Sequence, residues 1–121
     1  MDTRNVPDLV RKLYGAYVSK NRQVVEDLLS DDFSFTSPYD DHIGRTVYFQ
    51  KCWPYSERIK AFEIEKLFDK GNEAFIRYEI ETIAGDRFRN VEWMRFEGDK
   101  LQEVEVYFGS LADDDANGRK D

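Results

Sequence analysis

An acidic residue interrupts the apolar face of a predicted β-strand toward the C-terminal end of the chain. Within Arg87–Phe96, Phe88 and Met94 alternate on one face, and Glu92 falls on that same face. If this face looks into the core, the carboxylate needs a partner or keeps its proton with a raised pKa, because burying an isolated charge is unfavourable. Groups of that kind concentrate at functional sites. The opposite register would leave Glu92 in solvent, in cross-strand pairs, and periodicity alone leaves both registers open.

A second group of reactive side chains lies in the predicted loop Pro38–Gly44. Asp40, Asp41 and His42 follow one another there, and they can supply a general base only if the loop folds inward. Two acids and a histidine in a loop are more often solvated, because each is well hydrated when charged. Both positions of the loop stay open at this point.

The sequence lacks the residues and motifs that several other kinds of site need. Cys52 is the only cysteine and the chain has one histidine, so a cysteine and histidine zinc cage cannot form, and we expect no metal. Cys52 stands beside Trp53 in an apolar helical stretch, which is typical of a buried, inert thiol. The sequence has no glycine-rich phosphate loop and no Gly-x-Ser-x-Gly turn, and we expect no cofactor.

The elements that must position these residues begin with helices. Apolar residues recur at helical spacing over Val6–Leu29, with a polar break at 19–22, which indicates two helices joined by a short turn. Phe33–Ser37 then alternates strictly, as a strand does, and Pro38 closes it. Helical spacing returns over Arg45–Trp53 and ends at the next proline.

The C-terminal half is predicted to be a run of strands separated by short turns. Their ranges are Glu63–Asp69, Ala74–Ile83, Arg87–Phe96 and Leu101–Phe108. Helices followed by an antiparallel meander predict an α+β fold, with the helices packed on one face of the sheet. A chain of 121 residues has the length of one domain. We place it at 1–111, followed by an acidic tail, 112–121, that we expect to be disordered.

The net charge of the chain limits the classes of partner that it can bind. The net charge is -7, and no stripe of Lys and Arg is present to neutralise phosphates, which disfavours nucleic acids and anionic membrane surfaces. The acidic net charge suits a small ligand that is neutral or cationic. The N-terminus has no apolar secretory segment, and no run has the length of a membrane helix, so we expect a cytoplasmic protein.

The order of elements resembles the NTF2-like superfamily, in which N-terminal helices close a cone of curved antiparallel sheet. Asp31–Pro38 is similar to the first strand and turn of that fold, and Gly44-Arg45 to the start of its third helix. The turn Phe35–Tyr39, together with Cys52-Trp53-Pro54, looks most like SnoaL-like proteins of unassigned activity. The resemblance implies an α+β cone around a pocket, and it covers roughly residues 7–109.

Within that superfamily, Val91–Phe96 resembles the segment Ile-Asp-Val-Met-Arg-Phe of ketosteroid isomerases. The resemblance puts Glu92 where the isomerase has a protonated Asp, and Tyr14, or else Tyr17, near its catalytic tyrosine. It also matches Phe108 to an aromatic residue of the isomerase pocket. The isomerase base, however, is an Asp just before the proline that ends the first strand. Here that residue is Ser37, which cannot act as that base without an activating neighbour.

Limonene-epoxide hydrolases are a second comparison within the superfamily. Arg77-Tyr78-Glu79 imitates their Arg and Asp pair, but Gly109 stands where they have a second Asp. The apolar phase of this strand points Tyr78 inward and puts Arg77 and Glu79 on the outer face of the sheet. The epoxide hydrolase mechanism is therefore disfavoured.

These observations leave three hypotheses about function. The first is a domain that binds a small hydrophobic ligand in an aromatic pocket, with Glu92 as its polar anchor. The second is an acid/base enzyme without a cofactor, an isomerase, cyclase or dehydratase that acts on a hydrophobic cyclic or carbonyl substrate. In it Glu92 is the acid, Tyr14 a hydrogen-bond donor, and His42 or Asp40 the base. The pocket residues predicted for the first are Tyr14, Tyr17, Phe33, Phe35, Ser37, Tyr48, Trp53, Tyr78, Met94 and Phe108.

The third hypothesis is a module that binds a protein partner. The outer face of the sheet carries Val91, Trp93 and Tyr107 among alternating charges, which is typical of a dimer interface. We therefore expect a homodimer that pairs through this face.

Overall fold

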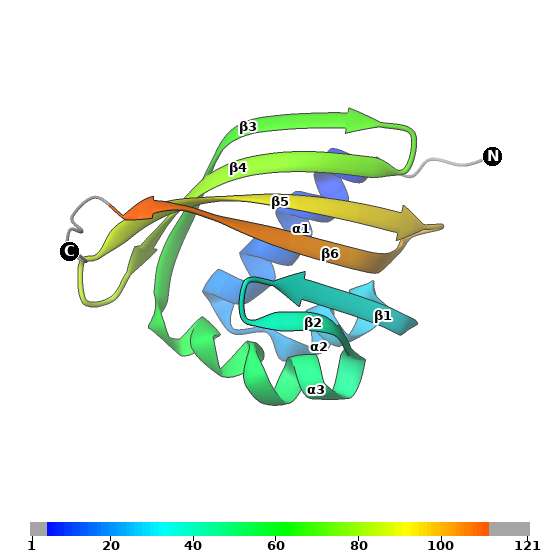
Figure 1. The fold of residues 1–121 in the computed structure, drawn as a ribbon, viewed down its shortest axis with the longest axis horizontal. Coiled ribbons are helices and arrows are strands. Elements are labelled where there is room, and N and C mark those ends of the chain that lie inside the picture. Colours follow the sequence, from blue (N-terminus) through cyan, green and yellow to red (C-terminus); the bar gives the residue numbers. More distant parts are fainter. Residues whose placement is uncertain (1–4, 112–121) are drawn as a thin grey trace.

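The computed structural model describes residues 5–111, and the predicted acidic tail lies outside this range. Helices come first and strands follow, so the predicted α+β class is confirmed (Figure 1). In chain order the elements are α1 (Val6–Ser19), α2 (Arg22–Leu28), β1 (Leu29–Ser37), β2 (Asp40–Gly44), α3 (Arg45–Lys51), the 3-10 helix η1 (Trp53–Arg58), β3 (Ile59–Lys70), β4 (Glu73–Thr82), β5 (Arg87–Glu97) and β6 (Lys100–Leu111).

Local sequence signals explain where the first helices begin and end. Asn5 caps α1, since its side-chain oxygen accepts a hydrogen bond from the backbone N–H of Asp8, and Pro7 stands in the first turn, where its missing N–H has no cost. Lys20 ends α1 in a left-handed conformation with φ of 62°. Asn21 then caps α2 in the same manner as Asn5 caps α1. The predicted break between two helices is confirmed.

The strands form one six-stranded sheet in the order β2-β1-β6-β5-β4-β3. Neighbours are antiparallel except β1 and β6, which run parallel. An entirely antiparallel sheet was expected, and the difference follows from topology. The three hairpins from β3 to β6 fix the direction of β6, which then meets the free edge of β1. Figure 1 shows β3 curving away from η1 along the far edge of the sheet.

Two differences from the sequence prediction bear on the site. Asp40–Gly44 was expected to be loop, but it forms the edge strand β2 and pairs with β1 across the turn at Pro38 and Tyr39. A short edge strand of polar, mostly exposed residues has no apolar alternation that would reveal it. Helix α3 stops at Lys51 rather than Trp53, and the chain continues as η1, with Pro54 in the first turn.

The strands turn their apolar phases toward the helices. On β4, Ile76, Tyr78 and Ile80 are buried, as their alternation predicts. On β5 the buried phase contains Met94 and Phe96, so the register that turns Glu92 inward is the one that the chain adopts. These side chains pack with α1, α2 and α3 into one core. No helix within residues 5–111 is both long and apolar enough to cross a membrane.

Candidate functional site

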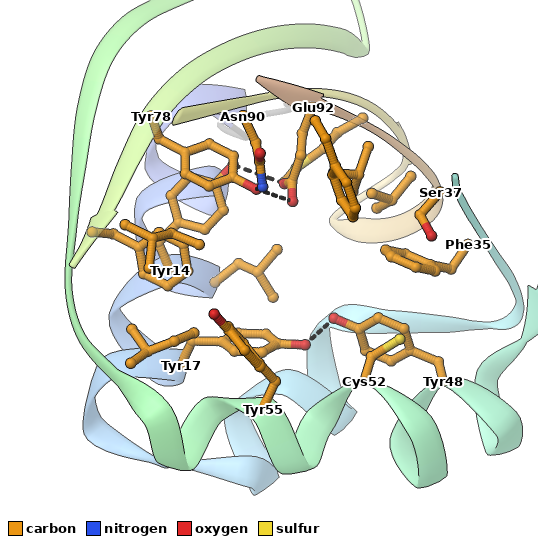
Figure 2. A pocket seen from close by; sticks show the side chains of 18 of the residues that line it. Tyr14, Tyr17, Phe35, Ser37, Tyr48, Cys52, Tyr55, Tyr78, Asn90 and Glu92 are labelled. Carbon is orange, nitrogen blue, oxygen red and sulfur yellow. Dashed lines mark hydrogen bonds between the residues drawn. The ribbon is translucent and has the colours of Figure 1, made fainter. Parts of the chain in front are cut away.

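A cavity of about 520 Å³ lies between the inner face of the sheet and the helices α1, α3 and η1. Its wall is mainly aromatic, and its few polar groups gather in two places, one around Glu92 and one around Asp40. Figure 2 shows the side chains that point into it from both layers. A volume of this size is in the range of sites for small organic molecules.

Glu92 is the polar centre of the inner end of the cavity. The hydroxyl of Tyr14, on α1, donates a hydrogen bond of 2.8 Å to Oε1 of Glu92, and the hydroxyl of Tyr78, on β4, donates one of 2.8 Å to Oε2. The side chain of Glu92 is half-buried, and it lines the cavity. Both tyrosine rings are buried. Three separate elements therefore meet at one carboxyl group.

The environment raises the pKa of all three groups. Burial raises the pKa of Glu92 above its ordinary value, and the hydrogen bonds from Tyr78 and Tyr14 offset only part of that shift. Burial, and then the nearby Glu92, raise the pKa values of Tyr14 and Tyr78 well above the ordinary value of tyrosine. Both tyrosines thus stay protonated as donors, while Glu92 is a carboxyl group that takes up a proton more readily than usual.

Asn90 supports this group from the same strand as Glu92. Its amide Nδ2 donates to the hydroxyl of Tyr78 over 3.4 Å, and its Oδ1 accepts from the backbone N–H of Gly109 over 3.3 Å. Gly109 has no room for a side chain, because a Cβ there would lie 2.1 Å from the carbonyl oxygen of Arg89. The second acid of the epoxide hydrolases, which the resemblance maps to this position, therefore has no space here.

Aromatic side chains enclose the rest of the cavity. Tyr14 stacks on Phe62 with ring centroids 4.8 Å apart, and Tyr78 meets Phe62 at 5.4 Å. Tyr17 and Tyr48 join the helical side of the wall through a hydrogen bond between their hydroxyls. Burial raises the pKa of both residues above the ordinary value of tyrosine. The wall thus consists of aromatic rings packed against one another, and its tyrosines keep their hydroxyl protons.

A second polar group, around Asp40, lies on the β1–β2 side of the cavity. Asp40 has a side chain only 9% exposed, and its Oδ1 accepts from Nζ of Lys51 over 2.6 Å. Its other oxygen accepts from the hydroxyl of Ser37 over 3.5 Å. Cys52 lies next to this group, and burial raises the pKa of its thiol to about 11. The Asp40 carboxylate is therefore positioned beside the residue that replaces the isomerase base.

The structure brings most of the predicted site residues to this cavity. Glu92 and Asp40 line it, and so do eight of the ten predicted pocket residues. Phe108 does so although it is 48% exposed, and its ring meets that of Tyr39 at 5.4 Å. The wall residues in question are Tyr14, Tyr17, Phe35, Tyr48, Tyr78, Met94 and Phe108, with Ser37 beside Asp40.

Three predicted residues do not line the cavity. His42 has a positive φ of 53°, its side chain is 61% exposed, and it pairs with Asp41 over 2.6 Å, because β2 turns it to the outside of the sheet edge. Asp41 accordingly raises the pKa of His42 above its ordinary value. Phe33 packs behind Tyr48, and Trp53 packs on the edge of Tyr17, so both support the wall from behind. A base within the cavity can be Asp40 but not His42.

Sequence reasoning missed several residues that belong to the site. Asn90 shares the inward phase of Glu92, and this phase was the available signal for it. Phe62 and Tyr55 come from β3 and η1, whose patterns were too weak to assign a facing side. Lys51 is a surface-type residue at the end of a short helix, and nothing in the sequence links it to Asp40.

The outer face of the sheet carries charges and a few apolar groups. Arg77 donates to Glu65, and Glu79 lies near Arg87 and Arg89, so Arg77 and Glu79 are on the outer face as expected, each paired with another residue. Tyr107 is 54% exposed there. Within residues 5–111, no three His, Cys, Asp or Glu side chains gather in a group that could hold a metal ion.

Comparison with known proteins gives one family and a consistent fold. The SnoaL-like domain family matches residues 10–104. No curated protein matches the chain in sequence. An NTF2-like protein of unknown function from Cytophaga hutchinsonii is similar in structure, with 23% identity, a TM-score of 0.72, and coverage of 90% of this chain and 95% of that one.

Two further solved structures share the fold at lower identity. A hypothetical protein with a ketosteroid isomerase-like fold from Catenulispora acidiphila, in complex with trimethylamine, is 14% identical, with a TM-score of 0.71 and coverage of 87% of this chain and 88% of that one. An LEH-like epoxide hydrolase from M. tuberculosis is 14% identical, with a TM-score of 0.71 and coverage of 84% and 80%. Similarity at this level concerns the fold alone. The family match spans most of the chain and agrees with that fold, and the protein therefore belongs to the SnoaL-like domain family.

Proposed function

We propose that this protein binds a small, largely hydrophobic molecule in the cavity beneath its sheet. The observation that carries the proposal is the aromatic cavity of about 520 Å³, at whose inner end two tyrosine hydroxyls hold the carboxyl group of Glu92. Sites for small molecules are mostly apolar, with a few placed polar groups that fix orientation. Protein cores without a ligand site are normally packed without large voids, so an open cavity among buried aromatic rings also supports a binding role.

The similar structures support a small-molecule role in general terms. The protein from Catenulispora acidiphila was solved with trimethylamine, and the M. tuberculosis protein is an epoxide hydrolase, so this fold accommodates small molecules in both. Neither fact assigns a ligand to this chain, whose own polar groups differ from the epoxide hydrolase pattern at Gly109.

The test uses native mass spectrometry of the purified protein, together with a matched pair of variants. Ile80 lines the cavity and is 5% exposed, whereas Ile83 follows it on the outside and is 67% exposed. Ile80→Trp should fill the cavity and abolish a co-purified ligand mass, while Ile83→Trp should keep it. Thermal unfolding of both variants checks that they fold. A ligand retained equally by both variants would place it elsewhere and refute the proposal.

A second candidate function is acid/base catalysis, and one observation favours it. Asp40 is a second carboxyl group on the same cavity, held by Lys51 at 2.6 Å, while the raised pKa of Glu92 favours its protonated form. One acid whose pKa is raised and one that is paired with a cation are the two partners that a proton transfer within a bound molecule needs. Asp40 would accept the proton, and protonated Glu92 would donate one to a developing oxyanion.

Kinetics with an identified substrate would test this second function. Asp40→Asn and Glu92→Gln should each lower kcat by about 100-fold or more, which is the usual contribution of a positioned acid or base. His42→Ala is the control, since its side chain is outside the cavity, and it should leave kcat unchanged. Turnover that survives both carboxyl substitutions would leave only the binding function.

A further inference from the structure

The polar group at the inner end of the cavity presents hydrogen-bond acceptors. Tyr14 and Tyr78 each have one hydroxyl proton, and both protons go to Glu92 over 2.8 Å. The amide of Asn90 is partly engaged, since one N–H of its Nδ2 donates to Tyr78 and its Oδ1 accepts from Gly109. What remains for a ligand is mainly lone pairs, on the carboxylate of Glu92 and on the two tyrosine oxygens, beside the second N–H of Asn90. Such a surface suits a ligand that donates hydrogen bonds rather than one that accepts them.

Glu92 also has no cationic partner within the range 5–111. Lys51 is the one lysine or arginine on the cavity wall, and it is paired with Asp40 over 2.6 Å. The hydrogen bonds that Glu92 accepts come from tyrosines alone. A buried carboxylate is strongly stabilised by an opposite charge, so the ionised form of Glu92 lacks the counter-ion that would compensate its burial. A ligand can supply it.

The surrounding rings add a third feature. Figure 2 shows the Glu92 carboxylate pointing into a space that Tyr17, Tyr48 and Tyr55 bound on the opposite side. Tyr14 stacks on Phe62, and Tyr78 packs against both, so the wall beside the carboxylate consists of aromatic rings. The faces of aromatic rings attract cations, most strongly where water is excluded. The net charge of -7 further favours the approach of a cation.

From these three features we propose that the ligand is an organic ammonium ion: an amine nitrogen, protonated, on a compact hydrocarbon skeleton. The N–H donates to the Glu92 carboxylate and supplies its counter-charge, and the hydrocarbon part packs against the rings. The inference rests on the proposed small-molecule function and narrows it to a chemical class. Asp40 does not compete for the ammonium ion, because Lys51 already neutralises it.

The experiment uses three probes with the same rigid skeleton: 1-adamantylammonium, 1-adamantanol and 2-adamantanone. Isothermal titration at pH 7.5 measures the Kd of each, and competition between probes, with chemical-shift changes at cavity residues, shows that they share the site. We expect the Kd of the ammonium ion to be at least about ten-fold lower than that of the alcohol or the ketone. One cation–π contact or one ion pair shielded from water contributes about this much to binding. Glu92→Gln should remove that preference and leave the Kd of the alcohol within about three-fold, because Gln keeps the shape of the side chain and one acceptor oxygen but has no charge.

Glu97→Gln is the matched control, since Glu97 is an exposed residue at the end of the same strand, and it should keep the full preference for the ammonium ion. If the ketone or the alcohol binds in the cavity as tightly as the ammonium ion, the cation inference is overturned and the small-molecule function stands. If none of the three binds, the proposed function itself fails. Charge selectivity of the unmodified protein decides the question even if Glu92→Gln does not fold.

Discussion

Substitution of Glu92 by Gln should change the stability of the protein in a pH-dependent manner. The substitution keeps the shape of the side chain and one acceptor oxygen, but it removes the ability to ionise. Tyr14 and Tyr78 each donate 2.8 Å hydrogen bonds to the carboxyl group, yet burial still raises its pKa above the ordinary value. Desolvation therefore outweighs the preference of the two hydrogen bonds for the ionised form.

The sign follows from proton linkage. The folded protein holds the Glu92 proton to higher pH than the unfolded chain does, so ionisation of Glu92 lowers the free energy of unfolding as the pH rises. The loss begins near the ordinary pKa of Glu, about 4.3, and is complete above the raised pKa of the folded state. Each unit of difference between the two pKa values corresponds to about 1.4 kcal/mol. Glu92→Gln escapes this loss.

The assay is urea or thermal unfolding followed by circular dichroism at a series of pH values from about 4 to about 8. The two proteins should have similar stability at the acid end. At the alkaline end Glu92→Gln should be the more stable protein, and each 1 kcal/mol of difference corresponds to a rise in Tm of roughly 4 °C for a domain of this size. Glu97→Gln, exposed on the same strand, should follow the unmodified protein throughout. A constant difference across the range, or one that grows toward acid pH, would refute the assignment of a raised pKa.

Four other predictions follow from the same geometry. Tyr78→Phe removes a hydrogen bond that lowers the pKa of Glu92, so the pKa should rise further, as carboxyl chemical shifts in a pH titration would show; an unchanged pKa contradicts this. The thiol of Cys52, with its pKa raised to about 11, should react slowly with iodoacetamide at neutral pH and about ten-fold faster per pH unit below 11, and a rate like that of a free thiol would count against it. Gly109→Ala should lower the free energy of unfolding, measured by urea denaturation, by roughly 2 kcal/mol or more, because the new Cβ would meet a backbone carbonyl of β5. A smaller loss would mean that the two strands shift easily. Sedimentation at tens of micromolar should give a homodimer that Tyr107→Glu weakens, since this residue is exposed on the outer face; a monomer excludes it.

The sequence alone determined which faces of β4 and β6 look inward. Ile76, Tyr78 and Ile80 alternate with charged residues on β4, and burial follows that phase. The same rule holds on β6, where Val104 and Val106 are buried. A period of two is a local property of an extended chain, so it can be recognised without knowing what the strand packs against. The family resemblance then favoured the inward register for Glu92.

The tertiary structure decided which groups meet. Tyr78 reaches Glu92 because the β4–β5 register pairs Tyr78 with Asn90, and Tyr14 reaches it because α1 docks on the inner face of the sheet, 78 residues away in the chain. The short strand β2 turned Asp40 toward the cavity and His42 away from it. Register and helix docking result from the summed packing of many side chains, whereas a local pattern fixes only the direction in which each one points.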